Sequence, residues 1–463
     1  MILLSGLAVY LAQSIVGFFV MHLIWDVREI KALVFKFFLG IGMGAGLSSL
    51  FYFWWCWLYF PNRIYPFFVA FISIVLIVVI WRKEARQNWA GWQNVTLTSG
   101  IQKKILIWGT LLLTSVSLSV TNFWVRTIPI PHGFYDAWAI WNAGARFIYG
   151  NGTGWRQLFL QDPWSHTNYP LLVQLNVVIG WLFTGSSSTR IPLGFSLVMM
   201  LGLIGLVFSA LLIARDFEQG ALAAILFSSL PALALLGSFQ YAELQLSFFI
   251  LATGVLLYLY TTNANTRLLV LAGFFAGFAG WTKNEGQMFI ILSSVVCLGL
   301  SLVEKKNLFK YYLAGLLLPT LTILVFKSVT LPTDLFVDAA TSFSQLFDLS
   351  RYLLIFREIG EQFVSFGYWS VSFFVVLIVY TLLVWLRPVP AQGKRWLPLL
   401  LCLLQFGGYY IIYLITPYDL SWHLNTSLGR LIFQLLPLML FWLFTLLRSP
   451  SDIFQEKFAD TRA

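Results

Sequence analysis

The sequence predicts an all-α, polytopic membrane protein. Of its 463 residues, 59% are hydrophobic and only 10% are charged, whereas a soluble domain carries about 25% charged residues. A water-soluble core could not absorb this much apolar surface. Apolar runs of about 18 or more residues, each long enough to cross a bilayer as a helix, recur along the whole chain. The net charge of +10 is spread thinly over loops, which favours a role in membrane orientation over nucleic-acid binding.

About thirteen segments are predicted to span the membrane. They are 2–24, 34–59, 64–81, 105–125, 190–214, 219–237, 243–261, 267–281, 286–303, 309–329, 368–386, 396–416 and 428–447. The first lacks a basic n-region and a small-residue cleavage site, so we interpret it as a retained helix. Segment 169–185 is ambiguous, because it is short and contains Pro170, Gln174 and Asn176.

Charge decides how the ambiguous segment is interpreted. If 169–185 does not span, 19 of the 29 Lys and Arg residues face the cytoplasm, and if it spans, only 14 do. The positive-inside rule favours the first topology. The sequence therefore predicts a re-entrant or surface-lying helix at 169–185, an N-terminus outside and a cytoplasmic C-terminus, with the plasma (inner) membrane as the expected location.

Two outer loops, 126–190 and 330–367, follow from this topology. In the first loop, residues 136–149 have apolar positions at helical spacing and predict an interfacial amphipathic helix. Four rare polar clusters fall on the outer side. They are Tyr135-Asp136-Ala137-Trp138, His166-Thr167-Asn168-Tyr169-Pro170, Thr282-Lys283-Asn284-Glu285-Gly286, and Trp422-His423-Leu424-Asn425 with Arg430; Glu243 also lies there. Ionisable groups near hydrocarbon are costly, so these clusters are candidate functional sites.

The acidic candidates each have a structural and a functional interpretation. Asp136 follows a Pro/Gly-rich turn and is either a helix N-cap or a general base for an acceptor hydroxyl. Glu243 either favours the dipole of the helix that it begins or supports the site. Lys283 and Glu285 form either a local ion pair or a unit in which Lys283 contacts an anionic ligand and Glu285 orients a cation.

The remaining candidates are donors. His166, next to Tyr169, is a turn histidine, a phosphate donor or a proton carrier. Arg430 either snorkels to the interface or binds a lipid phosphate, with His423 about two turns away. The three cysteines lie in apolar runs without metal-like spacing.

The sequence lacks the motifs that are typical of several kinds of nucleotide and metal chemistry. The sequence contains no Walker loop, no Asp-x-Asp pair and no His/Cys metal spacing. This disfavours an ATP-driven pump and a nucleotide-sugar donor, and we expect no cofactor; a divalent metal lacks the acidic pair that would support it. A donor that is itself a membrane lipid remains compatible with the sequence.

At this point the chain resembles the GT-C superfamily of integral-membrane glycosyltransferases, in particular protein O-mannosyltransferases and lipid A aminoarabinose transferases. Asp136 in Tyr-Asp-Ala-Trp resembles their catalytic Asp at the start of the first outer loop. His166 to Leu172 is similar to their His- or Lys-Pro-Pro-Leu element, Glu243 to an acid that begins a later helix, Gly277 to Lys283 to a Gly-rich helix ending in Thr-Lys-Gly, and Arg430 to Pro437 to a late helix. Ala137 replaces the second acid of many members, only one Pro precedes Leu171, and Leu431 replaces a Tyr.

The resemblance implies three units: residues 1–103 as three extra N-terminal spans, 104–447 as the catalytic membrane domain, and 448–463 as a short cytoplasmic tail. It also implies an inverting glycosyltransferase that uses a polyprenyl-phosphate sugar. Asp136 would be the base; Arg430, Lys283, His166 and His423 would bind the donor phosphate; Glu243, Glu285 and Tyr169 would support them.

Neither the sugar nor the acceptor, which could be a glycan, a lipid or a protein, follows from the sequence. Membrane lipids are further expected partners, and nucleic acid is not. Two alternatives stay open: a transporter or flippase for a lipid-linked sugar, whose polar residues should lie near the midplane on broken helices, and a non-catalytic assembly subunit, in which the polar clusters could be replaced without loss of function.

Overall fold

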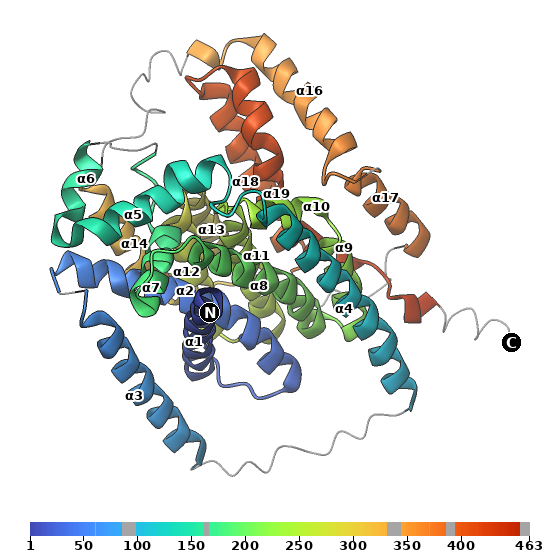
Figure 1. Cartoon of the computed structure of the whole chain (residues 1–463). Helices are drawn as coiled ribbons and strands as arrows, with labels where there is room; N and C mark the ends of the chain where they lie inside the picture. Colours follow the sequence, from blue (N-terminus) through green and yellow to red (C-terminus); the bar gives the residue numbers. More distant parts are fainter. Residues whose placement is uncertain are drawn as a thin grey trace, which may run out of the picture.

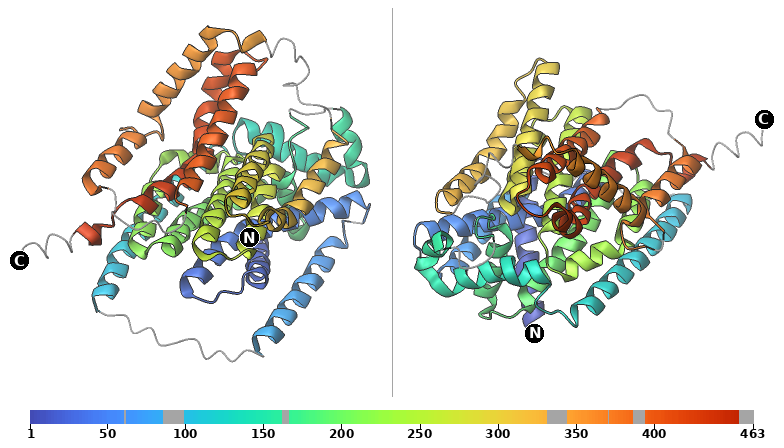
Figure 2. Two further views of the ribbon diagram at one scale, coloured as in Figure 1. Left: turned by 180° about the vertical axis from the view of Figure 1, so that it is seen from behind. Right: turned by 90° about the horizontal axis from the view of Figure 1, so that it is seen from above.

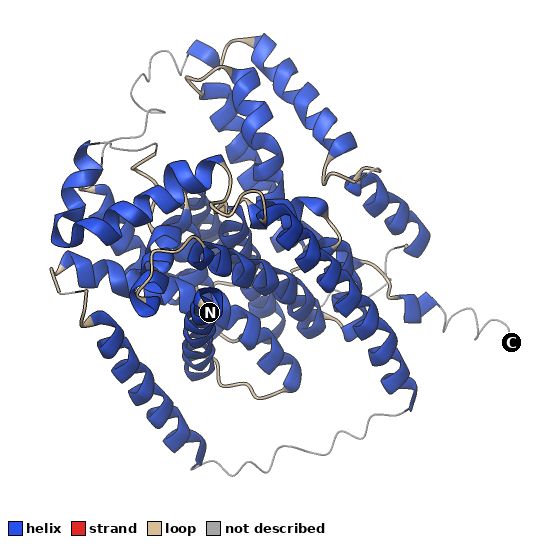
Figure 3. Ribbon diagram, in the orientation of Figure 1, coloured by secondary structure: helices blue, strands red, loops and turns tan. Residues whose placement is uncertain are grey.

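The computed structural model describes residues 1–60, 62–85, 99–161, 166–330, 344–369, 371–385 and 394–453. In these residues the regular elements are helices (Figure 3). Parts of both predicted outer loops, residues 162–165 and 331–343, lie outside the described residues, as do residues 454–463 of the predicted tail. The expected all-α architecture is confirmed.

Twenty helical elements follow one another in the described ranges. They are α1 (Ile2–Ile24), α2 (Ile30–Trp57), α3 (Tyr65–Ala85), α4 (Ser99–Thr127), the π-helix η1 (Ala137–Trp141), α5 (Asn142–Asn151), the 3-10 turn η2 (Gly152–Gly154), α6 (Trp155–Gln161), α7 (Leu172–Thr184), α8 (Arg190–Ala214), α9 (Phe217–Ser228), α10 (Pro231–Ser238), α11 (Glu243–Asn263), α12 (Arg267–Thr282), α13 (Asn284–Val303), α14 (Phe309–Lys327), α16 (Leu349–Ser365), α17 (Phe373–Val384), α18 (Trp396–Ile415) and α19 (Leu420–Leu446).

The number of spans was overestimated from the sequence. Nine helices in the described ranges are long and apolar enough to cross a bilayer, and a tenth span results if the bent pair α9–α10 is counted as one. The nine are α1, α2, α4, α8, α11, α13, α14, α18 and α19. The prediction of thirteen spans is therefore wrong, although the prediction of a multi-pass membrane protein is confirmed.

A proline explains why the predicted span 219–237 is broken. Leu230 is extended, with ψ of 119°, and Pro231 begins a new helix. A residue before proline avoids the helical conformation, because the proline ring would collide with it. The chain therefore bends by 62° between α9 and α10, a feature that a sum of hydrophobicity over the segment cannot detect.

The predicted spans 64–81, 267–281 and 368–386 correspond to shorter apolar helices. These are Tyr65–Leu76 within α3, the 16-residue α12 and the 12-residue α17. A helix rises 1.5 Å per residue, so α12 covers about 24 Å, less than the ~30 Å of a hydrocarbon core. In the predicted span 368–386, residues 370 and 386 lie outside the described residues.

The ambiguous segment 169–185 forms α7, which is buried among other helices. All residues from Leu172 to Trp181 are buried, and α7 packs against α1, α2, α5 and α8. With 13 residues it is also too short to cross a bilayer on its own. The structure therefore agrees with the prediction that this segment does not cross the membrane on its own.

The helix α11 forms the centre of the bundle. Every residue from Glu243 to Tyr260 is buried, and α11 packs against α8, α12 and α19. Figures 1 and 2 show α3, α4 and α16 at the periphery. Since the polar residue Glu243 begins the most deeply buried helix, its carboxylate is held inside the protein rather than at a surface.

Small residues allow the backbones of α12 and α14 to touch. A Cβ atom added to Gly273 would lie 2.0 Å from the carbonyl oxygen of Tyr312, and one added to Gly315 would lie 1.9 Å from that of Val270. Close approach at small residues is a typical way of packing helices in membranes, where lipid removes the hydrophobic drive for association. This contact fixes α12, whose last residue adjoins Lys283.

Candidate active site

Asp136 is positioned by the turn that follows α4. Gly133 has a φ of +77°, and the backbone N–H of Phe134 donates to the carbonyl oxygen of Phe239 at 3.2 Å. The rings of Phe134 and Phe239 stack with centroids 4.5 Å apart. These contacts dock the segment before η1 onto the connection between α10 and α11. The Asp136 side chain makes no capping hydrogen bond to η1, so the simple N-cap interpretation is wrong.

Arg430 is the partner of Asp136. It lies in the third turn of α19, which Asp419 caps by accepting from the backbone N–H of Trp422 at 2.8 Å. Arg430 Nη1 donates to Asp136 Oδ2 and lies 3.7 Å from Glu243 Oε1. Its Nε donates to the Thr426 carbonyl oxygen at 3.0 Å. Within the described residues, Nη2 makes no hydrogen bond and is free to bind a ligand.

Lys283 continues this chain of charges on the other side of Glu243. It is extended between α12 and α13, and its Nζ lies 3.1 Å from Glu243 Oε1 and 2.8 Å from Glu285 Oε1. Gly286 makes this junction possible, because a Cβ there would lie 1.9 Å from the Ala279 carbonyl oxygen. The close approach of the first turn of α13 to the last turn of α12 thus sets the position of Lys283.

The five groups form a continuous row of alternating charge. In order they are Asp136, Arg430, Glu243, Lys283 and Glu285. The Glu243 side chain is 1% exposed and that of Lys283 is 5% exposed. Three carboxylates against two cations leave a net charge of −1. The residues of the row come from the connections that precede η1, α11 and α13, from the first turn of α13, and from α19. The predicted polar clusters therefore meet at one end of the bundle.

Burial and charge set the protonation of the groups around Lys283. Burial by itself lowers the pKa of Lys283, but Glu243 and Glu285 together hold this pKa well above its usual value. The pKa of Tyr169 is raised by burial and by the Glu285 carboxylate, so its hydroxyl keeps its proton. Lys283 is therefore a permanent cation whose charge is already matched within the protein.

Two carboxylate oxygens in the row remain unpartnered. Glu243 Oε2 and Glu285 Oε2 are buried and take part in no hydrogen bond within the described residues. An unsatisfied buried acceptor costs roughly 1–3 kcal/mol, and more when it is charged. Such oxygens can accept hydrogen bonds from the hydroxyl groups of a bound ligand, which would remove this cost.

Aromatic side chains line one side of the charged row. Lys283 Nζ lies 5.7 Å from the ring centroid of Tyr169, which stacks on Trp141 at 5.5 Å. The ring of His166 lies 5.0 Å from that of Tyr169. Arg430 Cζ lies 5.1 Å from the ring centroid of Tyr241. His166 and Tyr169 thus adjoin the row, as predicted, while Trp141 and Tyr241 were missed.

Lys327 is another residue that sequence reasoning missed. It ends α14, and its Nζ donates to the Asn168 carbonyl oxygen at 2.6 Å and to Asn284 Oδ1 at 2.9 Å. Both partners are neutral, and no carboxylate pairs with Lys327 in the described residues. Its only signal in the sequence is its place at the C-terminal end of an apolar run, and that place equally fits a residue that flanks a span. Its charge is therefore available to a ligand.

His423 does not join the charged row directly. Its Nδ1 lies 3.0 Å from Thr416 Oγ1, and its ring contacts that of Tyr413 at 4.9 Å. Within the described part of the chain it forms no hydrogen bond or ion pair with the five charged groups. Its ring faces the end of α18, and Glu285 and Arg430 lie close enough to interact with it electrostatically.

Among the residues that the structure describes, no group of three His, Cys, Asp or Glu side chains could hold a metal ion. The chain matches no protein-family model, no curated protein and no solved structure. The described residues thus form an all-helical, multi-pass integral membrane protein with nine or ten candidate spans and a buried row of five charges.

Proposed function

We propose that this protein is a glycosyltransferase that moves a sugar from a polyprenyl-phosphate donor to an acceptor hydroxyl. The observation that carries the proposal is the buried row from Asp136 to Glu285. Burying paired charges is at best a weak source of stability, and well-packed apolar groups often serve as well or better. Charges gathered from four distant segments in a membrane protein therefore favour a functional role.

The groups of the row and its surroundings suit the two substrates of such a reaction. Lys327 Nζ offers positive charge for the donor phosphate, and Arg430 Nη2 offers a hydrogen-bond donor, whereas both hydrogen-bonding directions of Lys283 are taken up by Glu243 and Glu285. The free oxygens of both glutamates suit the hydroxyls of a sugar. Tyr169 and Tyr241 offer flat surfaces on which a sugar ring can stack.

The reaction then proceeds as a displacement at the anomeric carbon. The acceptor hydroxyl gives its proton to Asp136 as its oxygen forms a bond to that carbon. The bond between the anomeric carbon and the phosphate oxygen breaks, and the electron pair leaves with polyprenyl phosphate. Arg430 and Lys327 stabilise the growing negative charge on the leaving group. The configuration at the sugar inverts, and the proton passes from Asp136 to solvent.

A panel of donors tests this proposal. The purified protein is incubated with polyprenyl-phosphate sugars and a membrane extract that supplies acceptors, and free polyprenyl phosphate is measured. We expect release from one donor and a labelled sugar on a component of the extract. If no donor is consumed in any extract, the transferase proposal is wrong.

One observation favours a second candidate, a transporter for a lipid-linked sugar. The helix pair α9–α10 is broken by 62°, and broken helices are typical of transporters. In liposomes that contain the purified protein, a transporter would move a labelled lipid-linked sugar between leaflets without consuming it. A transferase would cleave the donor and leave the distribution of intact donor unchanged.

A further inference from the structure

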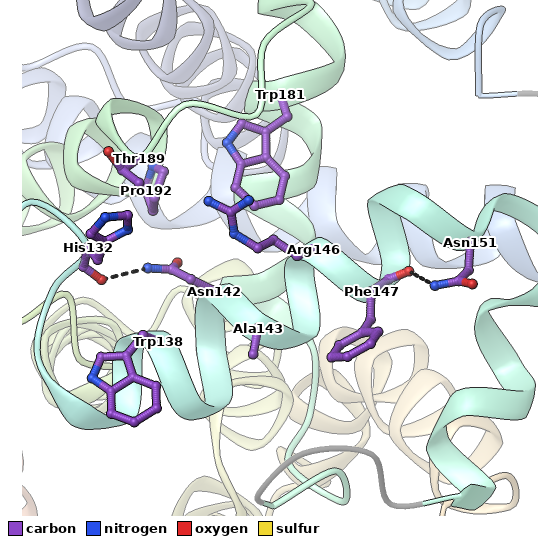
Figure 4. A pocket seen from close by; sticks show the side chains of 10 residues that line it. All are labelled: His132, Trp138, Asn142, Ala143, Arg146, Phe147, Asn151, Trp181, Thr189 and Pro192. Carbon is purple, nitrogen blue, oxygen red and sulfur yellow. Dashed lines mark hydrogen bonds between the residues drawn. The ribbon is translucent and has the colours of Figure 1, made fainter.

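A pocket lies along the helix formed by η1 and α5, on another side of this helix from Trp141, which packs near the charged row. The pocket has a volume of about 330 Å³ and lies between this helix, the loop that carries His132, and the α7–α8 region (Figure 4). A volume of ~300 Å³ or more is enough for a small ligand or headgroup. Trp138, Asn142, Arg146, Trp181 and Thr189 help to line it.

The lining of this pocket is basic and aromatic. The Arg146 guanidinium lies 5.6 Å from the ring centroid of Trp181, and Figure 4 shows Arg146 and His132 extending toward Trp181 and Thr189. The pocket has no acidic lining residue. Within the described residues, neither Arg146 nor His132 forms an ion pair. A ligand that brings negative charge would therefore meet an unneutralised cation.

A hydrogen bond connects the pocket to the segment of chain that leads into Glu243. Asn142 Nδ2 donates to Gln240 Oε1 at 3.0 Å and to the His132 carbonyl oxygen at 3.3 Å. Gln240 has a φ of +58° and lies three residues before Glu243. On another side of the same helix, Trp141 stacks on Tyr169 beside Lys283. One helix thus separates two sites that differ in charge.

We propose that this pocket binds a phosphate-bearing headgroup. Arg146 provides charge-assisted hydrogen bonds to the phosphate, the His132 ring provides a further donor, and Trp181 covers the headgroup. The proposal does not depend on the transferase reaction, since the pocket and the charged row use different side chains. The phosphate can belong to a membrane lipid or to a soluble ester.

Direct binding to the full-length protein in nanodiscs tests the pocket without any turnover. The soluble probe is glycerol 3-phosphate, measured by calorimetry. The lipid probe is phosphatidic acid, introduced into nanodiscs of phosphatidylcholine and followed by the rise in unfolding temperature. Binding of glycerol 3-phosphate identifies a soluble source, and a response to phosphatidic acid alone identifies a lipid source. If neither probe binds at millimolar concentration, the proposal is overturned.

Three variants assign the binding to this pocket. Arg146→Gln should weaken binding of the active probe about tenfold or more, the loss expected for one charge-assisted hydrogen bond. His132→Gln should also weaken binding, and it leaves the contact between Arg146 and Trp181 intact. The matched control is Arg190→Gln, which removes the same charge next to the lining residue Thr189 but outside the lining. Equal losses in Arg146→Gln and Arg190→Gln would show a nonspecific charge effect and overturn the proposal.

Discussion

Arg430 pairs with Asp136, which lies 294 positions earlier in the sequence, and also adjoins Glu243. Each of these residues could be selected from the sequence, because an ionisable group stands out in an apolar chain. Their pairing could not be predicted, since it depends on how α11 and α19 pack. Sequence reasoning also assigned phosphate binding to Lys283, but its charge is taken up by Glu243 and Glu285. Lys327, with neutral partners, is the better candidate.

Removal of the Lys283 charge tests its structural role. Lys283→Met leaves the Glu243 carboxylate, which is 1% exposed, without its cation at 3.1 Å. Breaking a buried pair in this way costs about 3–5 kcal/mol, so the unfolding temperature in detergent should fall strongly. In Lys327→Met, only hydrogen bonds to two neutral oxygens are lost, and the fall should be smaller. Equal unfolding temperatures for wild type and Lys283→Met would contradict the assignment.

Lys327 should instead affect donor binding. Because its charge is not matched in the protein, Lys327→Met should raise KM for the polyprenyl-phosphate donor by about tenfold, as expected for loss of one charge-assisted hydrogen bond. The matched control is Lys310→Met, which changes an exposed lysine near the other end of α14. Steady-state kinetics with varied donor measure the effect, and an unchanged KM in Lys327→Met would remove this residue from the phosphate site.

At the scale of elements, the helical spacing of apolar residues predicted helix positions better than the apolar content of a segment predicted membrane spans. The amphipathic helix expected at 136–149 is present as η1 and α5, with Ile140, Trp141, Ala145 and Ile148 buried. The span 219–237 was predicted from its apolar content alone, and Pro231 divides it into α9 and α10. The short α12 was taken for a full span for the same reason. Local backbone chemistry, rather than polarity, limits these helices.

The close contact between α12 and α13 leads to a prediction about Gly286. A Cβ there would lie 1.9 Å from the Ala279 carbonyl oxygen, so Gly286→Ala must push the first turn of α13 away from α12 and displace Lys283. We expect a lower unfolding temperature and loss of activity. Gly299→Ala is the matched control in the same helix, where the new Cβ meets nothing within 4 Å; there, alanine should be neutral or stabilise by up to about 1 kcal/mol. Similar behaviour of the two variants would show that the junction does not position Lys283.

At the scale of the whole molecule, the polar clusters that the sequence predicted to share one side lie together at one end of the bundle. The ends of α4 and α12 and the beginnings of α11, α13 and α19 meet around the charged row. Which membrane face carries this end depends on the positive-inside rule. The high hydrophobic content of the sequence correctly identified a membrane protein. The number of spans could be determined only from the helix lengths in the structure.

Cysteine labelling tests the predicted orientation. Ser187→Cys, in the α7–α8 loop, should react with a membrane-impermeant thiol reagent in intact cells, because the charge count puts this loop outside. Lys306→Cys should react only after the membrane is opened. The native Cys56, Cys297 and Cys402 are buried and should give little background. The opposite pattern of labelling would invert the proposed topology.

The most direct measurement of the central claim is donor cleavage by Asp136→Asn. This change keeps the size of the side chain and removes the base that pairs with Arg430. Asp348→Asn is the control, since Asp348 caps α16 and asparagine caps helices equally well. At equal amounts of folded protein, release of polyprenyl phosphate should fall about 10²–10⁴-fold in Asp136→Asn and stay at the wild-type rate in Asp348→Asn. Full release by Asp136→Asn would contradict the account.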